Sequence, residues 1–532
     1  MMTGKNYIGN VLSSTGKITF KTFNPKTNTE NETVYTEAAG AEIEAAVRLA
    51  DAAFTAYSQV SGADKSAFLT AIAQEIEALG SLLIDTYCSE TGLPESRALG
   101  ERGRTIFQLR SFAALVAEGS WVEAAISTAD ATRKPLPKVS VRSMLTPLGP
   151  VVVFGASNFP LAYSTAGGDT AAALAAGCPV IVKSHPMHAG TGELIASAVI
   201  RAAEQTGMPR GVFSNLNSRG IEVGVELVKH PKVKAVGFTG SVQGGRALYD
   251  LASQRPEPIP FFAEMGSINP VVLLPEAMEK NAEKWARAYA TSIALGSGQF
   301  CTNPGLILGV KGNSLDQFIA ILAKELANTV PSCMLHPKIV GSYENNKKMM
   351  ADHSGVNPVI KHTGDVGINE GRPAVMTVDG ATFSENKNLH QEVFGPFSLV
   401  VQCTHVEALT AVLAGLEGQL TGTIIGETKE IHQYPSLIST LQQKVGRLIF
   451  NGVPTGVEVC ESMVHGGPYP ASTDSRFTAV GTRSIKRWLR PVSFQQWPND
   501  LLPDALKDEN PLKIHRKVDG IPTKDPISDV VS

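Results

Sequence analysis

Cys301 stands in a sequence that suits a reactive thiol. It follows the segment Gly296–Phe300, which reads Gly-Ser-Gly-Gln-Phe. Small residues before a cysteine leave room for a substrate beside the thiol, whose thiolate form is the nucleophile. A lone cysteine is more often a small buried hydrophobe, so its neighbours must decide. The other five cysteines have no comparable context, and we expect them to be structural: Cys88, Cys178, Cys333, Cys403 and Cys460.

Two further side chains have properties that a reacting thiol requires of its neighbours. Glu264 lies between aromatic and small residues in FFAEMGS (261–267), where partial desolvation moves a carboxyl pKa up toward the range of a general base. The alternative is a glutamate paired with an arginine. Asn158 follows the apolar run VVVF (151–154), and its amide can donate to an oxyanion. The alternative is a turn residue.

Two features suit a nucleotide. Lys183 ends the apolar run VIVK (180–183), and the carboxyl end of a parallel strand is where nucleotides bind. Thr239–Gly245 is rich in glycine and opens a helix, so its free N–H groups would attract a pyrophosphate. An ordinary turn and a solvated lysine are the alternatives. Neither G-x-G-x-x-G after a strand nor G-x-x-x-x-G-K-[ST] occurs.

The elements around these residues predict two doubly wound α/β units. Helical periodicity marks 41–58, 64–88 and 100–118, and a strand or hairpin is expected in 133–150. Apolar strands then alternate with helices from residue 151, and a second alternation runs from 270 to about 450. The tail after Pro498 is polar, and we expect a surface extension there.

Composition excludes several classes of protein. The 532 residues carry a net charge of −3, so no basic field favours nucleic acid. The longest apolar runs are far shorter than a membrane span, and no signal sequence is readable. The six cysteines form no C-x-x-C pair, which argues against a metal site or a disulfide framework. We expect a cytoplasmic enzyme without a metal.

Six ordered stretches together resemble the aldehyde dehydrogenase superfamily along most of the chain. They are PLGPVVVFGASNFP (147–160), VIVKSHP (180–186), VGFTGSVQGG (236–245), AEMGSINP (263–270), GQFC (298–301) and QEVFGP (391–396). Family spacing is kept, with Cys301 lying 37 residues after Glu264 and 91 residues before Glu392. The resemblance implies the aldehyde dehydrogenase fold and oxidation of an aldehyde with NAD or NADP.

The resemblance also implies a role for each site residue. Cys301 would be the nucleophile, Glu264 the general base, and Asn158 the oxyanion donor together with the backbone N–H of Cys301. The residues implied to hold the cofactor are Lys183 at the adenine-side ribose, Gly240, Ser241 and Gly245 at the pyrophosphate, Glu392 at the nicotinamide ribose and Phe394 near its ring.

The family fold implies a division of the chain into parts. Residues 1–132 and 149–263 would form the nucleotide-binding domain, to which 455–483 return, and 264–454 the catalytic domain. Residues 133–148 and 484–500 would form a small β-arm for oligomerisation, and 501–532 a C-terminal extension. A homodimer or homotetramer is expected.

One departure from the family pattern bears on the cofactor. Many members read K-P-S-E after the lysine, and that glutamate binds the 2′-hydroxyl of NAD. This chain has Pro186 at the position of the glutamate. The change removes a repulsion against the 2′-phosphate, so NADP is slightly favoured over NAD.

Flanking segments resemble the branch of α-ketoglutarate semialdehyde (2,5-dioxopentanoate) dehydrogenases and NADP-dependent fatty aldehyde dehydrogenases. Succinic-semialdehyde enzymes carry an arginine where this chain has Ala166. Alignment instead places Arg104 at the mouth of the substrate tunnel, where a guanidinium would bind a carboxylate. Pairing with a surface acid is the alternative for Arg104. We expect 2,5-dioxopentanoate as substrate. The alternatives are a medium or long-chain fatty aldehyde and, more remotely, a non-catalytic structural role.

Overall fold

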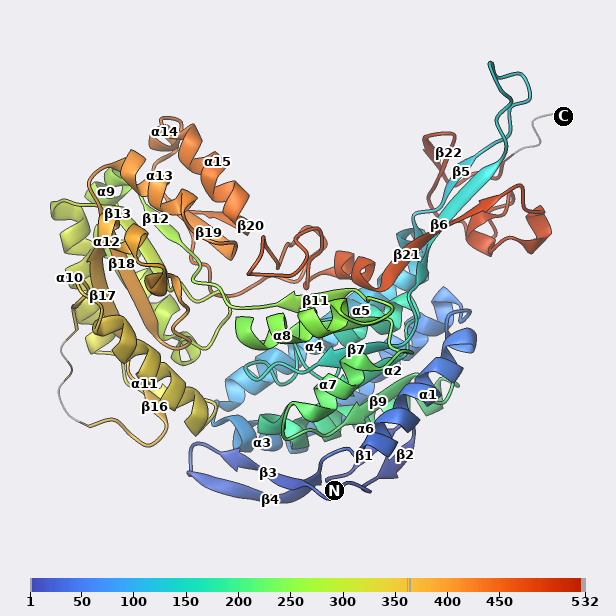
Figure 1. Ribbon diagram of the computed structural model, residues 1–532, viewed down its shortest axis with the longest axis horizontal. Coiled ribbons are helices and arrows are strands. Elements are labelled where there is room, and N and C mark those ends of the chain that lie inside the picture. Colours follow the sequence, from blue (N-terminus) through green and yellow to red (C-terminus); the bar gives the residue numbers. More distant parts are fainter. Residues whose placement is uncertain (1, 361, 363–364, 528–532) are drawn as a thin grey trace.

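The computed structural model describes residues 2–360, 362 and 365–527. Two α/β lobes lie side by side, and a thin arm of strands projects from one of them (Figure 1). The first strand, Asn6–Ile8, belongs to the first lobe, and the last strand of the described chain, Ile521–Thr523, belongs to the arm. This arrangement confirms the predicted α/β fold with doubly wound parallel sheets.

The first lobe contains a seven-stranded sheet. From one edge to the other its strands are β11 (Phe261–Glu264), β10 (Ala235–Thr239), β7 (Val151–Phe154), β8 (Val180–Lys183), β9 (Phe213–Leu216), β1 (Asn6–Ile8) and β2 (Val11–Ser13). The five strands from β11 to β9 are parallel, and β1 and β2 are antiparallel additions. Because β7 and β8 are buried on both faces, they read as almost unbroken apolar runs, whereas β9 also buries Ser214 and Asn215.

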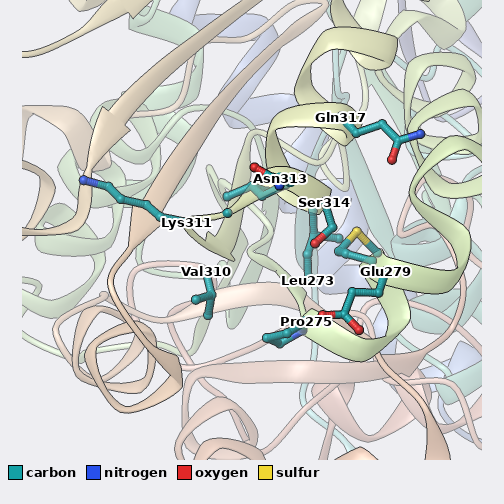
Figure 2. Close-up of a pocket in the computed structure, with 11 residues that line it drawn as sticks. Leu273, Pro275, Glu279, Val310, Lys311, Asn313, Ser314 and Gln317 are labelled. Atoms are coloured by element: carbon teal, nitrogen blue, oxygen red, sulfur yellow. The ribbon is translucent and has the colours of Figure 1, made fainter.

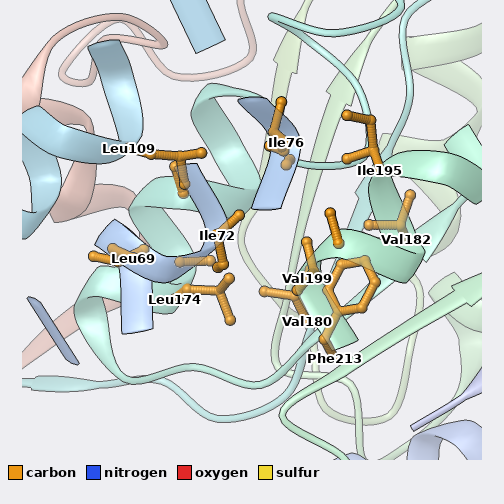
Figure 3. Close-up of a cluster of buried hydrophobic side chains, with 14 of the residues drawn as sticks. Leu69, Ile72, Ile76, Leu109, Leu174, Val180, Val182, Ile195, Val199 and Phe213 are labelled. Atoms are coloured by element: carbon orange, nitrogen blue, oxygen red, sulfur yellow. The ribbon is translucent and has the colours of Figure 1, made fainter. Parts of the chain in front are cut away.

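Helices cover both faces of this sheet. They are α1 (Gly40–Tyr57), α2 (Gly62–Ala78), α3 (Gly80–Thr91), α4 (Glu95–Glu118), α5 (Gly168–Ala176), α6 (Ala189–Gln205), α7 (Glu222–Lys229) and α8 (Val242–Ser253), with the hairpin β3 (Thr19–Asn24) and β4 (Thr29–Thr36) alongside. Figure 3 shows how Leu69 and Ile72 of α2 meet Leu174 and the strand residues Val180 and Phe213 in one core.

One predicted helix is divided in two. The pattern over 64–88 predicts a continuous helix, but the structure breaks it between α2 and α3, where Gly80 has φ 57°. Glycine tolerates this left-handed conformation, which turns the chain away from the first axis. Among the described residues no single helix is long and apolar enough to cross a membrane; only the bent pair α2 and α3 would pass that test together.

The second lobe repeats the doubly wound plan. Its sheet runs β15 (Asn357–Pro358), β17 (Ala374–Asp379), β18 (Phe397–Cys403), β13 (Leu306–Val310), β12 (Val271–Leu273), β19 (Gln419–Ile425) and β20 (Val445–Phe450). All neighbours are parallel except β15 and β17. Its helices are α9 (Pro275–Ala294), α10 (Asn313–Ala327), α11 (Pro337–Ala351), α12 (Gly380–Glu385), α13 (Val406–Ala414), α14 (Thr428–Ile431) and α15 (Pro435–Lys444), and β14 (Ser332–Cys333) pairs with β16 (Glu370–Gly371).

The arm is a five-stranded sheet. It consists of β21 (Leu489–Gln495), β6 (Val141–Pro147), β5 (Ala125–Ser127), β22 (Arg516–Val518) and β23 (Ile521–Thr523). The C-terminal tail differs from the predicted surface extension, because β22 pairs with β5. Its Leu502, Leu506 and Ile514 pack in a small apolar core with Val122 and Ile126. The tail is polar on average, so its composition does not predict that these few apolar side chains are buried.

Candidate active site

The edge of the first sheet gathers most of the predicted residues. Lys183 ends β8 and Glu264 ends β11, while Asn158 follows β7. Parallel neighbours end at the same edge of a sheet, so these side chains share one face of the first lobe. The second lobe supplies Cys301, from the loop that leads into β13, and Glu392, from the loop before β18.

The oxyanion candidate reaches the loop of the cysteine. The side-chain amide of Asn158 donates to the backbone carbonyl of Gln299, 3.1 Å away and two residues before Cys301. Arg97 of α4 secures this junction: its guanidinium lies 4.4 Å from the ring centre of Phe159 and 4.7 Å from that of Phe300. The side chains flanking Asn158 and Cys301 are therefore held by one cation.

The environment of Cys301 keeps its thiol protonated. Burial, then the charges of Glu392 and Glu264, raise its pKa to about 12, against the opposing charges of Arg104 and Arg447. A thiol of this kind needs a proton acceptor before it can attack. The imidazole Nε2 of His465 lies 3.6 Å from Sγ, within hydrogen-bond distance for sulfur.

His465 is a site residue that the sequence analysis missed. It lies in HGGPYP (465–470), where nothing in the local pattern points to Cys301, 164 residues earlier. Burial, and then Arg447, Arg104 and Arg487, lower its pKa to about 3. The ring is therefore neutral near pH 7 and a weak base, so it acts at Sγ as a hydrogen-bond partner.

Glu264 is both desolvated and paired with an arginine. It is buried near the thiol, and burial raises its pKa to about 7. Its Oε1 also accepts a hydrogen bond from Arg487, a buried residue whose other terminal nitrogen lies 3.3 Å from Asp169. Its Oε2 is buried and has no hydrogen-bond partner among the described residues. The carboxylate is thus held by one oxygen, with the other free to meet a proton.

Comparison with known proteins shows to which family the chain belongs. The sequence matches the aldehyde dehydrogenase family over residues 11–478. The chain belongs to the aldehyde dehydrogenase family. It is 47% identical over 520 residues to alpha-ketoglutaric semialdehyde dehydrogenase 2 of Azospirillum brasilense, covering 98% of this chain and 99% of the relative. It is 44% identical over 522 residues to the alpha-ketoglutaric semialdehyde dehydrogenase of Acinetobacter baylyi, with the same coverage.

Solved aldehyde dehydrogenase structures share the fold. Betaine aldehyde dehydrogenase from Staphylococcus aureus in complex with NAD⁺ aligns with a TM-score of 0.79 at 20% identity, over 93% of this chain and 95% of that one. A 1-pyrroline-5-carboxylate dehydrogenase from Thermus with bound NAD aligns at 0.77 and 21% identity, over 92% of each chain. These structures show the fold, and the family match with the two relatives supports an NAD(P)-dependent aldehyde oxidoreductase.

The residues at the sheet edge fit a dinucleotide. Ser241 caps α8 with its Oγ on the N–H of Gly244, 3.1 Å away, and the exposed start of the helix can receive a pyrophosphate. The side-chain ammonium of Lys183 makes no hydrogen bond or ion pair with the described residues, and burial lowers its pKa to about 8. A cation held in this way suits a polar ligand such as a ribose.

Gly266 leaves a narrow space beside Glu392, the residue expected at the nicotinamide ribose. A Cβ on Gly266 would lie 2.7 Å from Oε2 of Glu392. Burial raises the pKa of Glu392 to about 7, opposed by a hydrogen bond from the backbone of Ser267. Phe394 lines the same narrow space between Glu392 and the loop of Cys301. Bulk at position 266 would close the path along this carboxylate.

Arg104 does not pair with an acidic neighbour in the described part of the chain. Its guanidinium donates to the backbone carbonyl of Val457 and to the hydroxyl of Tyr163, 3.2 Å away. Its charge acts on the thiol of Cys301 and on His465. Among the described residues Arg104 forms no surface ion pair, and its positive charge lies near Cys301.

The cavity in Figure 2 is a separate feature. It measures about 460 Å³ and is lined by residues including Leu273, Pro275, Val310 and Asn313. These residues lie at the carboxyl ends of β12 and β13, whereas Cys301 precedes the amino end of β13. The cavity is therefore on the opposite edge of the second sheet and is not the reaction site.

Proposed function

We propose that this enzyme oxidises 2,5-dioxopentanoate to 2-oxoglutarate. The observation that carries the proposal is Arg104, a partly buried cation near Cys301 without a carboxylate partner in the described residues. A guanidinium binds a carboxylate through two parallel hydrogen bonds. The relatives at 47% and 44% identity carry the name of an enzyme for this semialdehyde.

The reaction begins at Cys301. Its Sγ bonds to the aldehyde carbon as the thiol loses its proton to water, and the Nε2 of His465 lies 3.6 Å from the sulfur as a hydrogen-bond partner. The carbonyl oxygen becomes an alkoxide that the amide of Asn158 and the backbone N–H of Cys301 stabilise. When bound, the nicotinamide cofactor accepts the hydride. The acyl group that remains on sulfur is a thioester.

Glu264 completes the reaction by activating water. A carboxyl with a pKa of about 7 is substantially ionised at neutral pH and takes a proton from water efficiently. The hydroxide bonds to the thioester carbon, the carbon–sulfur bond breaks, and the acid leaves. Since Arg487 holds Oε1, the free Oε2 is the oxygen that receives the proton.

The cofactor residues are assigned as the family pattern implies. Lys183 holds the adenine-side ribose, and Glu392 and Phe394 hold the nicotinamide end. Gly240, Ser241 and Gly245 line the pyrophosphate. Pro186 begins the short helix Pro186–His188, three residues after Lys183, and it brings no carboxylate to the ribose. NADP is for this reason slightly favoured over NAD.

The arm supports a homodimer or homotetramer. It projects away from both lobes (Figure 1). Leu136 is 70% exposed and Trp497 is 51% exposed, so large apolar side chains remain uncovered at its end. A symmetric partner subunit would cover them.

Steady-state rates with two aldehydes and two cofactors test the proposal. The values of kcat/KM are measured for 2,5-dioxopentanoate and for a long-chain aldehyde, each with NAD and with NADP. The proposal expects the semialdehyde to be preferred. A preference for the long-chain aldehyde would support a fatty aldehyde dehydrogenase instead. Inactivity with both aldehydes would support a non-catalytic structural role. Product formation without coenzyme A excludes transfer of the acyl group to that thiol.

A further inference from the structure

A second arginine, Arg447, binds the same loop as Arg104. Arg447 belongs to β20 of the second lobe, whereas Arg104 belongs to α4 of the first. Arg447 donates to the carbonyl of Gly456, 2.9 Å away, and Arg104 donates to the carbonyl of the next residue, Val457. The two carbonyls belong to consecutive residues, so one loop holds both guanidiniums, and both charges act on the thiol of Cys301.

Neither guanidinium has a counter-charge. In the described part of the chain Arg104 and Arg447 form no ion pair, and the Nε of each is buried without a hydrogen-bond partner. Burial lowers the pKa of Arg447, and the groups that oppose this effect are the thiol of Cys301 and the hydroxyl of Tyr163. Both arginines therefore face the reaction site rather than a carboxylate.

The nearby acids are occupied elsewhere. Glu264 is bound by Arg487, and Glu392 receives a hydrogen bond from the backbone of Ser267. Glu458, in the same loop, is exposed and accepts the N–H of Val459, 3.2 Å away. Two partly buried positive charges without an anion are costly to bring together. An anionic ligand would remove that cost.

We propose that Arg447 is a specificity-determining residue that binds, together with Arg104, the carboxylate of the semialdehyde. This inference rests on the proposed function and adds to it. One arginine comes from each lobe, so an acid-bearing aldehyde is held at the junction of the lobes with its other end toward Cys301. Five N–H donors on each planar guanidinium leave free donors after the contacts to the loop and to Tyr163.

The test uses the full-length enzyme and four variants: Arg447→Met, Arg447→Lys, Arg104→Met and Arg102→Met. Each is assayed with 2,5-dioxopentanoate, with 5-oxopentanoate and with pentanal. We expect Arg447→Met to lower the ratio of kcat/KM for acid-bearing over neutral aldehyde by at least about tenfold, mainly through KM. Arg447→Lys keeps the charge and should recover part of the ratio. Arg102 of α4 donates to the carbonyl of Gly80, away from the site, so its variant controls for the loss of one positive charge.

A ratio that stays within about threefold of wild type in a folded Arg447→Met variant would overturn the inference. If that variant does not fold, the rate at which iodoacetamide labels Cys301 of the wild-type enzyme tests the inference instead. Glutarate, which carries carboxylates, should slow the labelling, and the neutral pentanamide should not. Equal slowing by both compounds would also overturn the inference. A wild-type enzyme that prefers 5-oxopentanoate to 2,5-dioxopentanoate would refute the proposed substrate, while the paired arginines could still pass their own test.

Discussion

Arg487 should set the pH at which the thioester is hydrolysed. Its guanidinium lies against the carboxylate of Glu264 and lowers the pKa of that group, against the larger effect of burial. Arg487→Met removes this positive charge. The pKa of Glu264 should rise above about 7, and a smaller fraction of the base should be ionised at neutral pH.

The size of the effect follows from the ion pair. Breaking a buried pair costs about 3–5 kcal/mol. If about 3 kcal/mol of this free energy stabilises the ionised form of Glu264, its loss raises the pKa of Glu264 to about 9, since about 1.4 kcal/mol corresponds to one pH unit. The ionised fraction at pH 7 then drops from about one half to about one hundredth, so hydrolysis should be roughly 50-fold slower. At high pH the rate should recover.

Rapid mixing across pH measures this rate, because hydrolysis follows the burst of reduced cofactor. Asp169→Asn is the matched control. The charge of Asp169 raises the pKa of Glu264, so its removal should move the midpoint to lower pH. An unchanged or lower midpoint in Arg487→Met would refute the reasoning. If Arg487→Met does not fold, Arg487→Lys should keep the midpoint near that of wild type.

Three other predictions concern the nucleophile, the cofactor and assembly. Cys301→Ser should retain less than about a hundredth of the oxidation rate while still binding cofactor by fluorescence titration, because losing a nucleophile costs several orders of magnitude; a higher residual rate would exclude the covalent route. Pro186→Glu should raise the ratio of kcat/KM for NAD over NADP at least about tenfold, since a carboxylate there repels the 2′-phosphate; an unchanged ratio would show that position 186 does not face the ribose. Light scattering at micromolar concentration should give a dimer or tetramer, and a stable monomer would contradict the role given to the arm.

The core strands could be predicted because each carries its own apolar signal, whereas their order in the sheet is known from the structure. VVVF (151–154) and VIVK (180–183) are apolar throughout since both faces are covered, and the structure has strands at both. The division between α2 and α3 depends on the left-handed conformation of Gly80, which cannot be predicted from the spacing of apolar residues. β22 and β23 depend on pairing with a distant strand, so the local sequence of the tail does not predict them.

The site was only partly predictable for a similar reason. Asn158, Glu264 and Cys301 each stand next to a strand in a distinctive local sequence. His465 and Arg487 reach the site through the return of the chain to the first lobe, and they lie 164 and 223 residues from their partners. Contacts over such separations are set by the packing of the two lobes.

The central claim is that the semialdehyde is carried as a thioester on Cys301. The direct measurement uses Glu264→Gln, in which the base for hydrolysis is lost but the thiol remains. After mixing with 2,5-dioxopentanoate and oxidised cofactor, a burst of reduced cofactor should be followed by a slow steady state. Mass spectrometry of the quenched enzyme should find the acyl group on the peptide that contains Cys301. An acyl group on another cysteine, or a burst without any acylated peptide, would contradict the account.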